Sequence, residues 1–208
     1  MADIFTIAKA AYDDSIEDLR RMTKLFEMAL ADYDGRVTLN QFDILLQYSL
    51  LQVALADGYL HVGECMFIKD LAQYSDFCIF LNQNGFHNVT WADIYNTRES
   101  YLNRLLDDAK ELIVDLSKDF ITVFANVDSI TEYDYLSDLK RNVTAMVLAT
   151  CQADGKAEAI ELSNGCLIFN ALEAIEQRKE KLIASEKKSK AKKTTENNSS
   201  KKTANSKK

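Results

Sequence analysis

The chain contains no proline in its 208 residues, and this feature most constrains its fold. Proline ends helices and is common in turns because it lacks a backbone N–H and fixes φ. Its absence favours long helices joined by short connections, as in helical bundles. Glycine is also scarce, at 6 residues, while 47% of the chain is apolar, which is enough for a sizeable core. The composition therefore predicts an all-α protein.

Apolar residues recur at three- and four-residue steps along most of the chain, as on one face of an amphipathic helix. The segment 39–56 is apolar nearly all round, which indicates a central, buried helix. We predict a helical bundle of about seven to nine helices. The expected helices cover residues 4–12, 14–31, 39–56, 61–82, 91–95, 97–125, 129–152 and 158–184.

The predicted boundaries rest on turns and capping residues. Gly35 is expected to adopt a positive φ in a turn, and Gly85 to end a helix. The stretch Asn126-Val127-Asp128 is expected to break the helix before it. The spacing of a capping box, which begins a helix, occurs at Thr38 with Gln41, Thr90 with Asp93, and Ser129 with Glu132.

Charge is distributed unevenly behind a net value of -7. Residues 187–208 hold nine lysines and one glutamate, which leaves 16 basic and 31 acidic side chains in residues 1–186. An acidic body favours cations and basic partners over nucleic acid. No large apolar side chain follows Ile183, so we predict a helical domain over 1–185 and a disordered tail over 186–208.

The lysines of the tail are suited to contact with an anionic surface such as a membrane. The tail has no aromatic residue on which bases could stack, so no specific nucleic acid is expected as a partner. The N-terminus does not resemble a signal peptide, and no apolar run approaches the roughly 20 residues that span a bilayer. We expect a cytoplasmic protein. None of the 4 cysteines forms a C-x-x-C pair, and their apolar surroundings indicate reduced core residues.

One short stretch occurs twice in the chain, and the two copies are 97 residues apart. In each copy an apolar helical pattern ends at an Ala, an Asp-Gly turn follows, and a Glu lies seven residues beyond the Asp. A carboxylate at that point is favoured by the dipole of the helix it begins. The copies are Ala56-Asp57-Gly58 with Glu64, and Ala153-Asp154-Gly155 with Glu161.

This spacing matches the second half of a calcium-binding EF-hand loop, in which Asp, Gly and Glu take the fifth, sixth and twelfth positions. Glu158 adds a carboxylate at the ninth position of the second copy. The first half of the loop is missing, because apolar residues such as Val53 and Leu55 replace its ligands. Each copy offers two or three oxygens where calcium takes about six to eight. A cation site therefore needs both copies, and its predicted ligands are Asp57, Glu64, Asp154, Glu158 and Glu161.

Local structure explains the same residues without a metal. Asp-Gly is a common turn at the end of a helix, and a Glu in the first turn of a helix is a common cap. A third stretch, Asp32 to Val37, also fits part of the EF-hand loop, and we interpret it as a turn and helix cap. The sequence therefore leaves two interpretations open for the repeat, a shared site for a calcium, magnesium or manganese ion and a pair of capped turns.

The duplicated motif resembles that of the TerB family of tellurite-resistance proteins and their TerB-like relatives. The resemblance rests on A-D-G-x-x-x-x-x-E at 56–64 and A-D-G-K-A-E-A-I-E at 153–161, with the polar region around Val89–Ile94 between them. It implies an all-α fold of two pseudo-symmetric halves and an acidic site for a divalent cation. It also implies a role in tellurite and other chemical stress, beside membrane-bound partners at the inner face of the membrane.

The chain departs from the family pattern at His61 and Gly63 and in its Lys-rich tail. It carries no P-loop, nucleophile elbow or zinc-protease motif, and we predict that it is not an enzyme. The first functional hypothesis is a TerB-like, metal-binding stress protein with protein partners, some of them membrane-bound. The alternative is a helical protein–protein interaction module in which the repeat is only structural.

Overall fold

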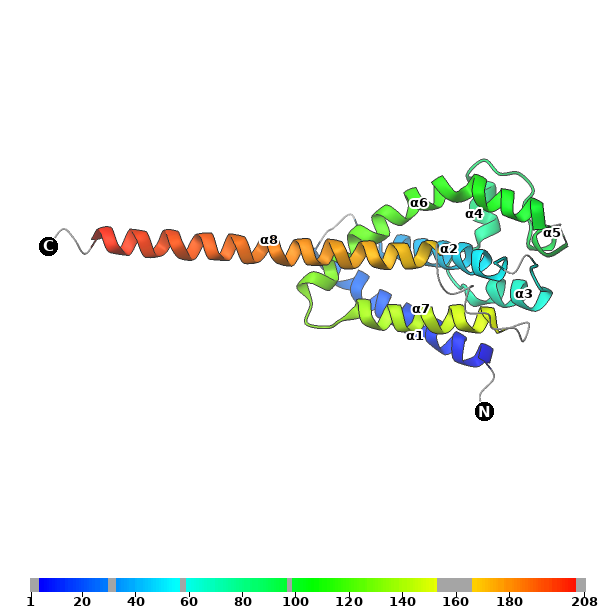
Figure 1. Ribbon diagram of the computed structural model, residues 1–208, viewed down its shortest axis with the longest axis horizontal. Coiled ribbons are helices and arrows are strands. Elements are labelled where there is room, and N and C mark those ends of the chain that lie inside the picture. Colours follow the sequence, from blue (N-terminus) through cyan, green and yellow to red (C-terminus); the bar gives the residue numbers. More distant parts are fainter. Residues whose placement is uncertain (1–3, 30–32, 57–58, 97–98, 153–165, 205–208) are drawn as a thin grey trace.

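The computed structural model describes residues 4–29, 33–56, 59–96, 99–152 and 166–204, with side chains up to Ser189. These residues form eight α-helices and no strand (Figure 1), which confirms the predicted all-α class and helix number. The helices are α1 (Ile4–Ala29), α2 (Gly35–Ala54), α3 (Val62–Leu71), α4 (Phe77–Gln83), α5 (Trp91–Asn96), α6 (Glu99–Ile130), α7 (Tyr135–Cys151) and α8 (Leu167–Ala204).

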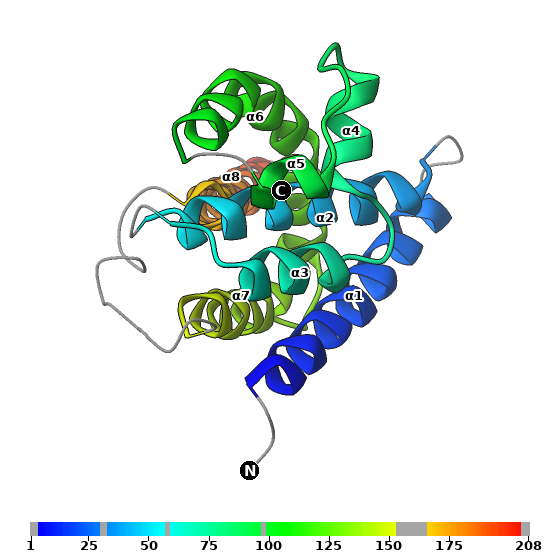
Figure 2. The same ribbon diagram turned by 90° about the vertical axis from the view of Figure 1, so that its right-hand side faces the viewer.

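Helix α2 forms the centre of the bundle, as its uniformly apolar sequence predicts. It packs against α1, α3, α4, α6, α7 and α8. Its aromatic and aliphatic side chains, including Phe42 and Tyr48, are almost completely buried. Around it, α1 pairs with α7 and α6 pairs with α8 (Figure 2). Helices α2 and α7 both run toward the end of the bundle at the right of Figure 1.

The predicted helix over 61–82 is wrong, because the chain forms two helices with a break between Leu71 and Phe77. The carboxylate of Asp43, from α2, accepts hydrogen bonds there from the backbone N–H groups of Gln73, Tyr74 and Ser75, at 3.1, 2.6 and 3.1 Å. A distant side chain thus satisfies backbone groups that a continuous helix would have paired internally.

The α6–α7 corner also differs from the prediction. Helix α6 continues to Ile130, so the expected break at Asn126-Val127-Asp128 is wrong. Helix α7 begins at Tyr135, and its first turn is capped by Asp134, which accepts a hydrogen bond from the Ser137 backbone N–H at 3.3 Å. The predicted capping box of Ser129 with Glu132 is therefore wrong.

Helix α2 begins four residues earlier than the sequence predicts. Asp34 is its N-cap, accepting from the Arg36 N–H at 2.9 Å, so the Thr38–Gln41 capping box is wrong and the predicted cap in the Asp32–Val37 stretch is confirmed. Gly35 does not have a positive φ. Its lack of a side chain matters for packing instead, since a Cβ there would meet Thr23 Cβ at 2.7 Å. Gly85 does have a positive φ, of 95°, after α4, as expected for a helix stop.

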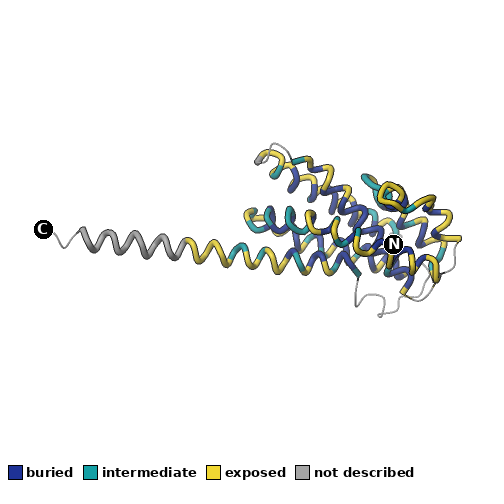
Figure 3. The backbone as a smooth tube through the Cα atoms, turned by 90° about the horizontal axis from the view of Figure 1, so that it is seen from above, coloured by how far each residue is buried: buried dark blue, intermediate teal, exposed yellow. Residues whose placement is uncertain are grey.

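Helix α8 begins at Leu167, and Cys166 precedes it outside the helix, so the predicted continuous helix over 158–184 is wrong. The described residues from Ala184 to Ser189 are all exposed, and the helix leaves the bundle as an arm (Figures 1 and 3). This segment therefore lacks a packed face, as its composition indicates. The backbone is helical to Ala204, and the disorder of 186–208 stays a prediction.

Three of the four cysteines, Cys65, Cys78 and Cys151, are buried, as expected for core residues. Burial raises the pKa of Cys65 to about 11, and it raises the pKa of Cys78 further. A thiol that stays protonated is a poor nucleophile and a poor metal ligand. These buried cysteines therefore act as small apolar residues of the core.

Candidate functional site

Glu64 is the member of the predicted cation site that the structure describes. It lies in the first turn of α3, as the sequence predicts, and it is buried. Its carboxylate oxygen Oε2 accepts a hydrogen bond from the backbone N–H of His61 at 2.8 Å. The reciprocal arrangement of a capping box, with His61 as N-cap, begins the helix at this point. Glu64 thus has a structural role that explains its position without a metal.

The other four predicted ligands, Asp57, Asp154, Glu158 and Glu161, lie outside the described residues. The structure does show the helix ends from which the two Asp-Gly turns depart. Both α2 and α7 end on the same side of the bundle (Figure 1), and α7 packs against α2 and α3. The helices that precede the two Asp-Gly stretches therefore end at the same end of the bundle.

Within the described parts of the chain, no three His, Cys, Asp or Glu side chains are grouped so that they could hold a metal ion. The third Asp-Gly stretch places Asp34 at the N-cap of α2, and Asp32 lies outside the described residues. The predicted metal site therefore rests on Glu64 together with residues that lie outside the described part of the chain.

The most strongly perturbed carboxyl group belongs to Asp43, inside α2. Its side chain is completely buried, and its Oδ1 accepts a hydrogen bond from the Tyr12 hydroxyl at 2.8 Å. Burial raises the pKa of Asp43 to about 6, against the opposing effect of the hydrogen bonds from Tyr12 and from the backbone of 73–75. The pKa of Tyr12 is raised as well, first by burial and then by the neighbouring charge of Asp43.

Perturbed titratable groups are candidates for function when they line a cleft. Asp43 instead faces a connection between two helices and uses its acceptors to hold that connection. Gln47, one turn along α2, does the same for the next residues, since its Oε1 accepts from the Phe77 N–H at 2.8 Å. We therefore assign Asp43 and Gln47 a structural role in ending α3 and beginning α4.

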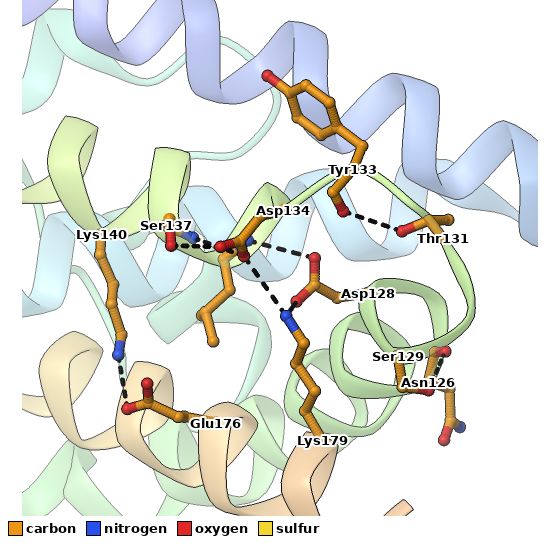
Figure 4. Close-up of polar contacts among 11 residues, drawn as sticks. Asn126, Asp128, Ser129, Thr131, Tyr133, Asp134, Ser137, Lys140, Glu176 and Lys179 are labelled. Atoms are coloured by element: carbon orange, nitrogen blue, oxygen red, sulfur yellow. Dashed lines mark hydrogen bonds and ion pairs between the residues drawn. The ribbon is translucent and has the colours of Figure 1, made fainter. Parts of the chain in front are cut away.

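A second buried carboxylate lies at the point where α8 leaves the bundle (Figure 4). The Asp128 side chain is completely buried in α6, and its Oδ2 is 2.6 Å from the Lys179 Nζ of α8. Its Oδ1 accepts from the Leu136 N–H of α7 at 3.3 Å. Lys179 also contacts Asp134 at 3.4 Å. This cluster joins α6, α7 and α8.

The electrostatics of this cluster favour the charged forms. Burial alone would lower the pKa of Lys179, but the hydrogen bond and charge of Asp128 outweigh it and the pKa is raised. Hydrogen bonds from Ser137 hold the pKa of Asp134 below its ordinary value, despite some burial. The ion pairs of Lys179 with Asp128 and Asp134 thus hold α8 against the α6–α7 corner at the point where α8 leaves the bundle.

Sequence reasoning missed Asp43, Gln47 and Lys179, and it misread Asp128. The first two were recognisable as isolated polar residues within the otherwise apolar α2, since a polar residue at a buried position needs a specific partner. Lys179 lies in a strongly charged stretch, and nothing in that stretch distinguishes it from its neighbours. Its role follows only from the packing of α8 on the α6–α7 corner.

The fold and these clusters define an all-helical bundle with a projecting C-terminal helix. Comparisons of the chain with models of known families, with curated proteins and with solved structures found no match. The resemblance to the TerB family consequently rests on the duplicated motif. Among the residues described, no helix has both the length and the apolar character needed to cross a membrane.

Proposed function

We propose that the chain is a non-enzymatic, TerB-like protein that binds a divalent cation through its two Asp-Gly connections and acts in a chemical stress response. The observation that carries the proposal is that α2 and α7, the helices that precede the two Asp-Gly stretches, end at the same end of the bundle, where α7 packs against α3 (Figure 1). Neither copy has enough oxygens to hold calcium alone, so proximity of the copies is what the site requires. The acidic body adds a favourable field for cations.

Thermal unfolding in the presence of calcium, magnesium or manganese tests the cation site. We expect at least one of these ions to raise the Tm of the full chain, because an ion that binds only the folded state stabilises it. The double substitution Asp57→Asn with Asp154→Asn should abolish the rise. Asn keeps an oxygen that caps a helix or turn but loses the charge that a hard cation prefers.

Asp34→Asn is the matched control, because it makes the same change at the third Asp-Gly turn. It should leave the rise in Tm intact. An unchanged Tm with all three ions would exclude the cation site. If Asp34→Asn reduced the rise in Tm as much as the double substitution does, the ions would act through the overall negative charge of the protein and not through the duplicated motif.

The alternative function, a helical protein–protein interaction module, is favoured by the geometry of Glu64. That carboxylate is already used in capping α3 by accepting from His61 at 2.8 Å. In this case the double substitution leaves partner capture unchanged, and the ions have no effect on Tm. The thermal experiment therefore separates the two functions.

The projecting end of α8 is proposed to bring the protein to an anionic membrane surface, where membrane-bound partners would be reached. Lys187 and Lys188 are exposed on it, and seven further lysines follow. A basic segment gains up to about 1 kcal/mol per lysine near such a surface. Co-sedimentation with vesicles containing phosphatidylserine should therefore be stronger for the full chain than for a chain that ends at Ala184. Equal sedimentation of the two chains would contradict membrane contact through the arm.

A further inference from the structure

A cleft of about 310 Å³ lies between the first turns of α2 and the second half of α6. The cleft lies at the start of α2, whereas the duplicated Asp-Gly stretches follow the C-terminal ends of α2 and α7. Among the described residues, its walls carry two carboxylates, Asp34 from the α2 cap and Asp119 from α6, and no lysine or arginine side chain. The volume is at the lower end of the range of small-molecule sites. A small ligand is therefore the right size for it.

The cleft is negatively charged without compensation from the residues around it. Asp119 is exposed and makes no ion pair with any described residue, because the nearby Lys118 pairs with Asp115. The Asp34 carboxylate accepts the N–H of Arg36, at 2.9 Å, and forms no ion pair with any described residue. The positive end of the α2 dipole amounts to about half an elementary charge, which offsets only part of two carboxylates. The cleft therefore favours a cation.

The amide of a largely buried residue supplies a second and independent sign of a ligand. Gln41 lines the cleft and has only 8% of its surface exposed, yet it makes no hydrogen bond with any described residue. Its amide atoms are not fully buried, so a water molecule or a ligand in the cleft can hydrogen-bond to them. Beside it, the Thr38 hydroxyl is already hydrogen-bonded to the Tyr33 hydroxyl. The Gln41 amide is thus the group left for a ligand to bind.

We propose that this cleft binds a small aliphatic diammonium ion. One ammonium group would bind Asp34 and Asp119, while the other would donate a hydrogen bond to the Gln41 amide oxygen. The methylene chain between them would contact the apolar walls that Val37 and Val123 provide. Two carboxylates suit an ammonium group, and the described residues hold no group of three metal-binding side chains. An organic cation therefore fits the cleft better than a metal ion.

Isothermal titration of the full chain with putrescine tests the proposal. We expect saturable binding to one site, and no binding of butanediol, which has the same chain length but no charge. Asp119→Asn should weaken putrescine binding about tenfold or more, since it removes a charge-assisted hydrogen bond. Gln41→Met, which keeps the size of the side chain, should weaken it severalfold.

Glu111→Gln is the control for general charge, because it removes the same charge two turns earlier on α6, outside the cleft. It should leave putrescine binding unchanged. The proposal is overturned if putrescine does not bind, if Glu111→Gln weakens binding as much as Asp119→Asn does, or if Gln41→Met has no effect. The last probe is Nα-acetyl-lysine amide, in which the side-chain ammonium group is free. Binding as tight as that of putrescine would assign the cleft to a lysine side chain of a protein and would also overturn the proposal.

Discussion

Asp43 and Asp128 are two buried aspartates whose carboxylates are stabilised in different ways. Both lie within a helix, and both accept hydrogen bonds from backbone N–H groups of a neighbouring connection or helix start. Asp128 is paired with a cation, Lys179, at 2.6 Å. Asp43 has no ion pair with any described residue, and it relies on Tyr12 and three N–H groups. The charge of Lys179 thus stabilises the Asp128 carboxylate, whereas the dipoles of one hydroxyl and three N–H groups stabilise the Asp43 carboxylate.

The difference follows from what each aspartate holds in place. Asp43 shapes a connection between two consecutive short helices, and hydrogen bonds to the backbone are sufficient for that. Asp128 joins the α6–α7 corner to α8, so its partner must reach across from another helix, and a long lysine side chain does this (Figure 4). Removal of Lys179, the partner of Asp128, should therefore lower the stability of the fold strongly. The contribution of Asp43 to stability should instead depend mainly on pH.

The largest effect is expected for Lys179→Met. This change leaves the completely buried Asp128 carboxylate without its cation, and breaking a buried pair in this way costs about 3–5 kcal/mol of stability. Urea unfolding followed by circular dichroism measures the loss. Lys140→Met is the matched control, because Lys140 forms the exposed pair with Glu176 between α7 and α8, at 2.7 Å. It should cost less than about 1 kcal/mol. Equal losses from the two variants would contradict a special role for Asp128.

The next effect is expected for Asp43→Ala, which should lower the free energy of unfolding by about 2–4 kcal/mol. It removes the acceptor for the Tyr12 hydroxyl and for three backbone N–H groups. The loss is smaller than for Lys179→Met because the released N–H groups lie in a connection that is only partly buried. Asp43→Asn should retain most of the stability, since its amide oxygen still accepts. A full loss in Asp43→Asn would show that the charge itself is required.

The same two aspartates show how far the sequence predicts the fold. Periodicity identified most helical segments and the buried α2, because burial of apolar residues repeats along the chain at the helical period. It wrongly divided α1 into helices over 4–12 and 14–31, which form one continuous helix. It placed one helix over 61–82, because the break there depends on a side chain about 30 residues earlier. It also placed a break at Asn126-Val127-Asp128, because the residue types favour turns and the partner Lys179 lies far along the sequence. Local patterns do not contain these long-range hydrogen bonds.

The candidate site was predictable to a similar extent. The first Asp-Gly turn with Glu64 correctly predicted the start of α3, because a capping box is a local feature. The continuous helix predicted over 158–184 was wrong, since Cys166 lies outside a helix and α8 begins at Leu167. The cleft between α2 and α6 was not predictable from the sequence, because its two carboxylates, Asp34 and Asp119, come from segments that are distant in the chain.

The smallest expected effect is a pH dependence that only Asp43 should produce. Its pKa of about 6 in the folded protein is above its ordinary value, so the folded state takes up a proton more readily than the unfolded state. The resulting stabilisation is present at low pH and is lost as the pH rises from about 4 to 6. Because Asp43→Asn cannot titrate, the stability of the original protein relative to this variant should fall by about 2 kcal/mol between pH 4 and pH 7.

Comparison of the two proteins at each pH removes the contributions of other groups, including Asp18, whose pKa is also raised by burial and then by Asp138. The raised pKa of Lys179 changes stability only under alkaline conditions, and the lowered pKa of Asp134 acts only at more acidic pH. Urea unfolding at pH 4, 5, 6 and 7 gives the required difference. A difference that stays constant across this range would show that dipoles stabilise the ionised Asp43 as fully as water does. The contrast with the ion-paired Asp128 would then rest on the substitutions alone.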